Sequence, residues 1–78
     1  MDLTEYCDCI RNAKSYMKKK DYVMALSYYE KAGEMEKAAK LHLKLGDWPK
    51  AADIYFNLGM TAKAVDIEEA GRKGKYNH

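Results

Sequence analysis

The chain has 78 residues, of which 47% are hydrophobic and 33% are charged, and its formal net charge is +2 at pH 7. This length predicts a single domain over residues 1–78 with a modest core, and the composition excludes an intrinsically disordered chain. A charge of +2 is too small to indicate nucleic-acid binding by itself. No stretch of the sequence approaches the roughly 18 apolar residues that a membrane-spanning helix needs.

The cysteines and the N-terminal residues indicate the compartment. Cys7 and Cys9 are the two cysteines, and they are too close in sequence to staple a fold. The first residues include Asp2, Glu5 and Asp8 and lack the apolar segment of a signal peptide. We therefore expect a soluble protein in the cytoplasm.

Residues 3–19 are predicted to form the first helix. An apolar stripe runs through them at spacings of three and four, namely Leu3, Tyr6, Ile10, Ala13 and Met17. Asp2 and Thr4 are the alternative caps for its start. Lys18, Lys19 and Lys20 at its end are typical of solvated charges that compensate the helix dipole, and a contact with phosphate or with an acidic peptide is the alternative.

Residues 20–71 repeat with a period of thirteen. The four units begin at Lys20, Gly33, Gly46 and Gly59, and the sixth place of each unit is alanine (Ala25, Ala38, Ala51 and Ala64). Because glycine ends helices readily, this period predicts helices at 22–32, 35–45, 48–58 and 61–71. We expect the tail, residues 72–78, to be frayed.

Helix starts are also marked in the sequence. Asp21, Asp47 and Thr61 are the expected N-caps of three of these helices. Pro49 falls in a first turn, where its missing N–H costs nothing.

Each of the four repeated helices is about eleven residues long, too short to be stable alone in water. In residues 48–58 the polar residues form a narrow stripe of Lys50, Asp53 and Asn57, and the rest of this helix is expected to be buried. The constant alanine favours close approach of helix backbones. We predict an all-α fold, a short right-handed α-solenoid of five helices in antiparallel pairs, with the polar helix 61–71 as a terminal cap. A fragment of a longer array is the alternative.

Several motifs resemble tetratricopeptide-type repeats. Ala13, Tyr16, Ala25, Tyr29 and Ala32 have the spacing of a tetratricopeptide helix pair. The helix pair here recurs every two units of thirteen, which is shorter than the repeat of about 34 residues in that family. The segments YYEKAG from Tyr28, LGDW from Leu45 and IYFNLGM from Ile54 resemble the short-helix repeats of intraflagellar-transport and coatomer-type coat proteins and of the vesicle-fusion adaptor SNAP. This resemblance implies a scaffold that binds other proteins.

The cysteines and His42 are the side chains that could bind a metal or take part in catalysis. Cys7 and Cys9 point to different sides of a helix, and a zinc site needs about four ligands, so we expect no metal. His42 shares a repeat position with Tyr29 and Tyr55 and is predicted to be packed and hydrogen-bonded. No motif places a nucleophile beside it, so we expect neither an enzyme nor a cofactor.

The seven tyrosines are expected to lie mainly in the core, and one adjacent pair is the exception. Tyr28 and Tyr29 cannot face the same way on a helix, so one of them is expected to be exposed.

A basic groove is the sharpest functional hypothesis. In tetratricopeptide-like arrays the first helix of each pair lines the concave face, and a shift of two periods maps Lys14 onto Lys40 and Lys18 onto Lys44. These lysines would form two parallel rows that clamp an acidic peptide or a C-terminal carboxylate. A solvated lysine face is the alternative.

The sequence therefore predicts a non-catalytic protein-interaction or scaffold module. Apolar groove residues Ile10, Met17 and Leu43 would be buried by a peptide or partner helix, and the lysines would orient an acidic partner. The alternatives are a nucleic-acid-binding helical repeat and a self-assembling component of a coat or transport complex.

Overall fold

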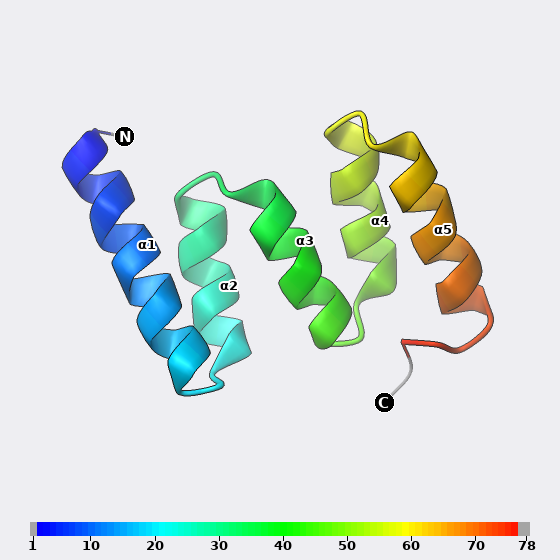
Figure 1. Cartoon of the computed structure of the whole chain (residues 1–78), viewed down its shortest axis with the longest axis horizontal. Coiled ribbons are helices and arrows are strands. Elements are labelled where there is room, and N and C mark those ends of the chain that lie inside the picture. Colours follow the sequence, from blue (N-terminus) through cyan, green and yellow to red (C-terminus); the bar gives the residue numbers. More distant parts are fainter. Residues whose placement is uncertain (1, 77–78) are drawn as a thin grey trace. The chain divides into compact units, whose positions relative to one another are not determined.

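The computed structural model describes residues 2–76, and within them it contains five helices and no strand (Figure 1). The helices are α1 (Leu3–Lys18), α2 (Tyr22–Lys31), α3 (Met35–Lys44), α4 (Trp48–Asn57) and α5 (Thr61–Arg72). The all-α prediction is confirmed, and the solenoid arrangement stays a prediction. Each of the first four predicted helices extends one residue too far at its end.

The chain divides into two compact units, Met1–Ala38 and Ala39–His78, and the division falls within α3. In the first unit α1 packs against α2, and in the second α4 packs against α5 (Figure 1). Each helix pair is joined by a short turn. The prediction of one domain over residues 1–78 stays a prediction.

The helix starts follow the predicted caps only in part. Asp2 caps α1, and its Oδ1 accepts a hydrogen bond from the Glu5 N–H at 2.8 Å. Asp21 caps α2 by accepting from the Met24 N–H at 3.3 Å. Thr61 was wrongly predicted as a cap, because it is the first residue of α5 and Met60 precedes it as the N-cap without a side-chain bond.

Asp47 lies at the N-cap position of α4, as predicted, but its side chain makes no capping bond. Its Oδ2 lies 3.7 Å from Nδ1 of buried His42 instead. Pro49 is in the first turn of α4, as predicted.

All five helices end in the same backbone pattern. After each helix the N–H of the second residue past the C-cap bonds to a carbonyl five residues back, and the N–H before it bonds to a carbonyl three residues back. This pattern requires a left-handed residue at the position after the C-cap. Glycine occupies that position after α2 to α5, at Gly33, Gly46, Gly59 and Gly74, and Lys20 occupies it after α1 with φ of 61°.

The predicted end of α5 at Gly71 is wrong. The helix continues to Arg72, and Gly74 takes the left-handed position with φ of 84°. Gly71 is buried inside α5, where a Cβ would overlap the indole ring of Trp48. This glycine therefore serves packing within the second unit and not helix termination. The first residue of the predicted tail, Arg72, belongs to α5. Residues 77–78 of the tail lie outside the described part of the chain.

The core is built on the repeated alanines. Ala25, Ala38, Ala51 and Ala64 are all at most 1% exposed, which fits close approach of helix backbones. Tyr55 is the largest fully buried side chain of the described residues. The prediction that residues 48–58 are buried apart from a polar stripe is wrong, because Phe56 is 59% exposed and Leu58, just after α4, is 46% exposed. Phe56 projects from the edge of the buried arc that Ala52 and Tyr55 form.

Candidate partner-binding surface

The predicted binding residues of α1 form one mixed stripe. Ile10, Lys14, Met17 and Lys18 follow one another at spacings of four, three and one, so that they lie on neighbouring parts of the helix surface. Lys14 and Lys18 are exposed, and Ile10 and Met17 are half-buried. The stripe therefore presents ammonium groups beside apolar side chains that retain contact with solvent.

The predicted residues of α3 have the same character. Lys40 and Lys44 are exposed one turn apart, and Leu43 between them is half-buried. Lys40 and Lys44 belong to the unit Ala39–His78, whereas Lys14 and Lys18 belong to Met1–Ala38. The pairing of the two lysine rows into one clamp stays a prediction.

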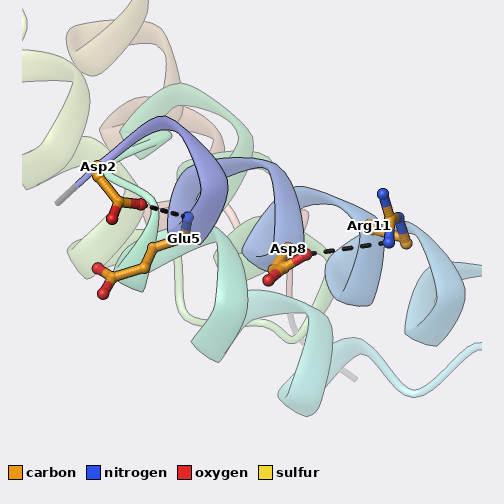
Figure 2. A network of polar contacts seen from close by, with 4 residues as sticks. All are labelled: Asp2, Glu5, Asp8 and Arg11. Atoms are coloured by element: carbon orange, nitrogen blue, oxygen red, sulfur yellow. Dashed lines mark hydrogen bonds and ion pairs between the residues drawn. The ribbon is translucent and has the colours of Figure 1, made fainter.

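A hollow in the first unit lies between α1 and α2, away from the predicted lysines. Its lining consists of Glu5, Asp8, Cys9, Asn12, Tyr28 and Lys31. Glu5 and Asp8 come from the acidic start of α1, where Asp8 also lies 3.9 Å from Arg11 (Figure 2). Sequence reasoning missed this hollow, although the spacing of Glu5, Asp8 and Asn12 puts them on one helix face. Carboxylates, an amide and an ammonium group give it mixed charge.

Tyr28 is the aromatic side chain of this hollow. Its ring stacks on that of Tyr16, with centroids 5.7 Å apart and an interplanar angle of 11°. Both rings are half-buried, whereas the neighbouring Tyr29 is buried. The two adjacent tyrosines of α2 thus face different ways, as predicted, and the more exposed one is held by a second ring.

Lysine side chains lie over tyrosine rings at several places. The Lys19 Nζ is 5.4 Å from the centroid of the Tyr16 ring. Lys37 lies over Tyr29 at 5.7 Å in the first unit, and Lys63 over Tyr55 at 5.1 Å in the second. The last two pairs occupy the same positions of the thirteen-residue period, two periods apart. These lysines stabilise packed rings by cation–π attraction and are poor candidates for partner recognition.

A hydrogen bond joins the start of α1 to the turn before α3. The Tyr6 hydroxyl donates to Oε1 of Glu34 within the first unit. This hydrogen bond, with partial desolvation and the nearby carboxylate charge, raises the pKa of Tyr6 above its ordinary value of 10.0. The contact is a structural link, because the hydroxyl and its partner satisfy each other.

The other candidate groups are placed as follows. Cys9 is buried and Cys7 is exposed, which agrees with the prediction that the two thiols point to different sides of α1. Within residues 2–76, no group of three or more His, Cys, Asp or Glu side chains has a geometry that could hold a metal ion. His42 is packed in the core, as predicted, with its Nδ1 3.7 Å from Oδ2 of Asp47, and its hydrogen bonding stays a prediction.

In the part of the chain that the structure describes, no helix has both the length and the apolar character needed to cross a membrane.

Comparisons with known proteins identify no relative. No protein-family model, no curated protein and no solved structure matches this chain.

Proposed function

We propose that this chain is a non-catalytic protein-interaction module whose helices stack as antiparallel pairs of a short, tetratricopeptide-like solenoid. Five short helices joined by turns of a few residues support this architecture. The thirteen-residue period, with a buried alanine in every unit, supports it further, because equivalent contacts can then recur along the chain. The proposed setting is the cytoplasm.

The observation that carries the functional proposal is the mixed apolar and basic stripe, which occurs on both α1 and α3. On α1 it combines half-buried Ile10 and Met17 with exposed Lys14 and Lys18, and on α3 it places Leu43 between two exposed lysines. A bound peptide or helix would bury the apolar groups, which supplies affinity. The ammonium groups would attract and orient carboxylates, which supplies orientation and speed of association.

The test is affinity capture from cell lysate, with and without nuclease. Wild type is compared with Lys14→Glu/Lys40→Glu, and Lys50→Glu/Lys75→Glu is a control with the same change of charge at other exposed lysines. We expect a protein partner that survives nuclease, is lost from the first variant and is retained by the control.

Two other outcomes redirect the proposal. Capture that disappears with nuclease would favour nucleic-acid binding, which falls steeply as salt increases. A partner held equally by all three proteins would keep the interaction module but remove the lysines from its binding surface.

A further inference from the structure

The turn between α1 and α2 differs from the other helix ends in one residue. The same hydrogen bonds close all five helix ends, since the Lys20 N–H bonds to the Met17 carbonyl and the Asp21 N–H to the Tyr16 carbonyl. Four of the ends use glycine in the left-handed position, and this one uses Lys20. The left-handed conformation costs lysine free energy because its Cβ approaches the following carbonyl, whereas glycine adopts it without that cost.

Lys20 also occupies the first place of its thirteen-residue unit, where the three later units have glycine. The turn would therefore form more easily with glycine than with the residue it has. Strained residues that the backbone does not require are candidates for a role of their side chain. The side chain of Lys20 is exposed, so that role is directed at solvent or at a partner.

The surroundings of Lys20 carry a concentrated positive charge. Residues 9–20 include five of the fourteen basic residues and none of the twelve acidic ones, so the remainder of the chain has a net negative charge. Lys18, Lys19 and Lys20 are all exposed. Immediately after the turn, Val23 is 63% exposed and Met24 37%. The turn thus combines three ammonium groups with an exposed apolar edge.

We propose that this turn is a docking point for an acidic peptide segment of a partner protein, with Lys18 and Lys20 contacting its carboxylates and Val23 its apolar side chain. This assignment rests on the proposed function and gives it a specific location. Charge complementarity selects the acidic partner, and the exposed Val23 favours a segment that also carries an apolar side chain.

Two neighbouring features favour a peptide over other polyanions. Single-stranded nucleic acid binds through bases stacked on accessible aromatic rings, and the ring over which the Lys19 Nζ lies, Tyr16, is already stacked on Tyr28. A continuous anionic lipid surface would also meet the carboxylate of Asp21, which the Met24 N–H holds next to the lysines. A peptide presents separate carboxylates that can contact the lysines and avoid Asp21.

The experiment pans a phage-displayed random peptide library against the full chain and measures binding of a fluorescein-labelled copy of the most enriched peptide by anisotropy. The variants are Lys20→Gly, Lys20→Ala and Lys20→Arg. We expect enriched peptides rich in Asp and Glu, bound about threefold more weakly by both uncharged variants and equally well by Lys20→Arg. Thermal unfolding separates the effect of backbone strain from that of the lost charge. Lys20→Gly relieves the strain and should raise the unfolding midpoint by about 4 °C, whereas Lys20→Ala keeps the strain and should leave the midpoint nearly unchanged.

Other results would overturn the assignment in distinguishable ways. Acidic peptides bound equally by Lys20→Ala, or enriched peptides without an acidic excess, would refute this turn as the docking point but leave peptide binding intact. Failure to enrich any peptide over an uncoated surface would refute both this assignment and the proposed function. A labelled single-stranded oligonucleotide or phosphatidylserine vesicles could instead bind more tightly than the enriched peptide and depend on Lys20. That result would refute the peptide and identify the turn as a site for nucleic acid or for anionic lipid.

Discussion

The α1–α2 turn and the α4–α5 turn have the same backbone and opposite surfaces. They lie three periods apart in the sequence, and the same pair of hydrogen bonds closes both. The first presents three lysines, with Lys20 in the left-handed position. The second has Gly59 there, beside Leu58, which is 46% exposed. The geometry of the turn therefore does not explain the lysine at position 20, where glycine would be less strained.

The interiors of the same helix pairs differ in a complementary way. A shift of three periods places Cys9 of α1 at the position of Trp48 in α4, and Ala32 at the position of Gly71 in α5. The first helix pair thus combines the small side chains of Cys9 and Ala32. The second combines the large indole ring of Trp48 with Gly71, which has no side chain. In the second pair the missing side chain of Gly71 leaves room for the Trp48 ring, as close packing requires.

The largest expected effect follows from that close packing. Gly71→Ala should lower the free energy of unfolding by about 3 kcal/mol, because its Cβ would overlap the Trp48 ring. Urea unfolding measures this change. The double variant Gly71→Ala/Trp48→Leu should recover part of the loss, and a fully additive double variant would contradict the packing of these two residues.

A somewhat smaller effect tests the repeated alanine. Ala51→Leu should destabilise the protein by about 2 kcal/mol, since residue 51 is 0% exposed and the added carbons have no space. Ala62→Leu is the matched control, because Ala62 is exposed on α5 and should change stability by less than about 0.5 kcal/mol. Chemical denaturation of both variants makes the comparison, and equal losses would argue against close approach at the repeated position.

The third prediction reverses the difference between the two turns. Gly59→Lys should cost about 1 kcal/mol, since φ at residue 59 is 81° and lysine is strained there. Gly59→Asn should cost less, because asparagine tolerates the left-handed region. Thermal unfolding midpoints report both changes. If Gly59→Lys were as stable as wild type, the strain attributed to Lys20 would not exist.

These variants also indicate how far the sequence predicted the structure. Local signals located the helices, because Asp21 and the glycines at the period of thirteen act through neighbouring backbone groups. The misassigned glycine, Gly71, is explained by Trp48, which belongs to the preceding helix and starts it. Similarly, Asp47 makes no capping bond, and its carboxylate lies beside the buried imidazole of His42, which comes from the preceding helix. Contacts between elements are what the local pattern does not contain.

The binding residues were predictable to a similar extent. Exposed lysines at helical spacing, such as Lys14 and Lys18, follow directly from periodicity. The hollow lined by Glu5 and Tyr28 was not predicted, because it forms only where α1 and α2 meet. Lys20 was read as a charge at a helix end, because its conformation becomes visible only when φ is known.

The smallest expected effect is confined to alkaline pH. The raised pKa of Tyr6 means that the folded state holds this proton more tightly than the unfolded state. Its contribution to stability is therefore fully present below the ordinary pKa of 10.0 and is lost as the pH rises through the higher folded value. Tyr6→Phe should show a weaker loss of stability above pH 10.0 than wild type does, measured by denaturation at a series of pH values. Parallel pH profiles for the two proteins would contradict the bond to Glu34.

The most direct test of the account is to map where an acidic peptide binds. An isotope-labelled sample of the full chain is titrated with the enriched peptide, and backbone amide shifts are followed by NMR. We predict that the largest changes fall on residues 18–24, at the turn that contains Lys20, and that Lys20→Ala reduces them. Changes centred on residues 56–60, at the apolar turn with Gly59, would show that exposed apolar side chains and not the lysines select the partner.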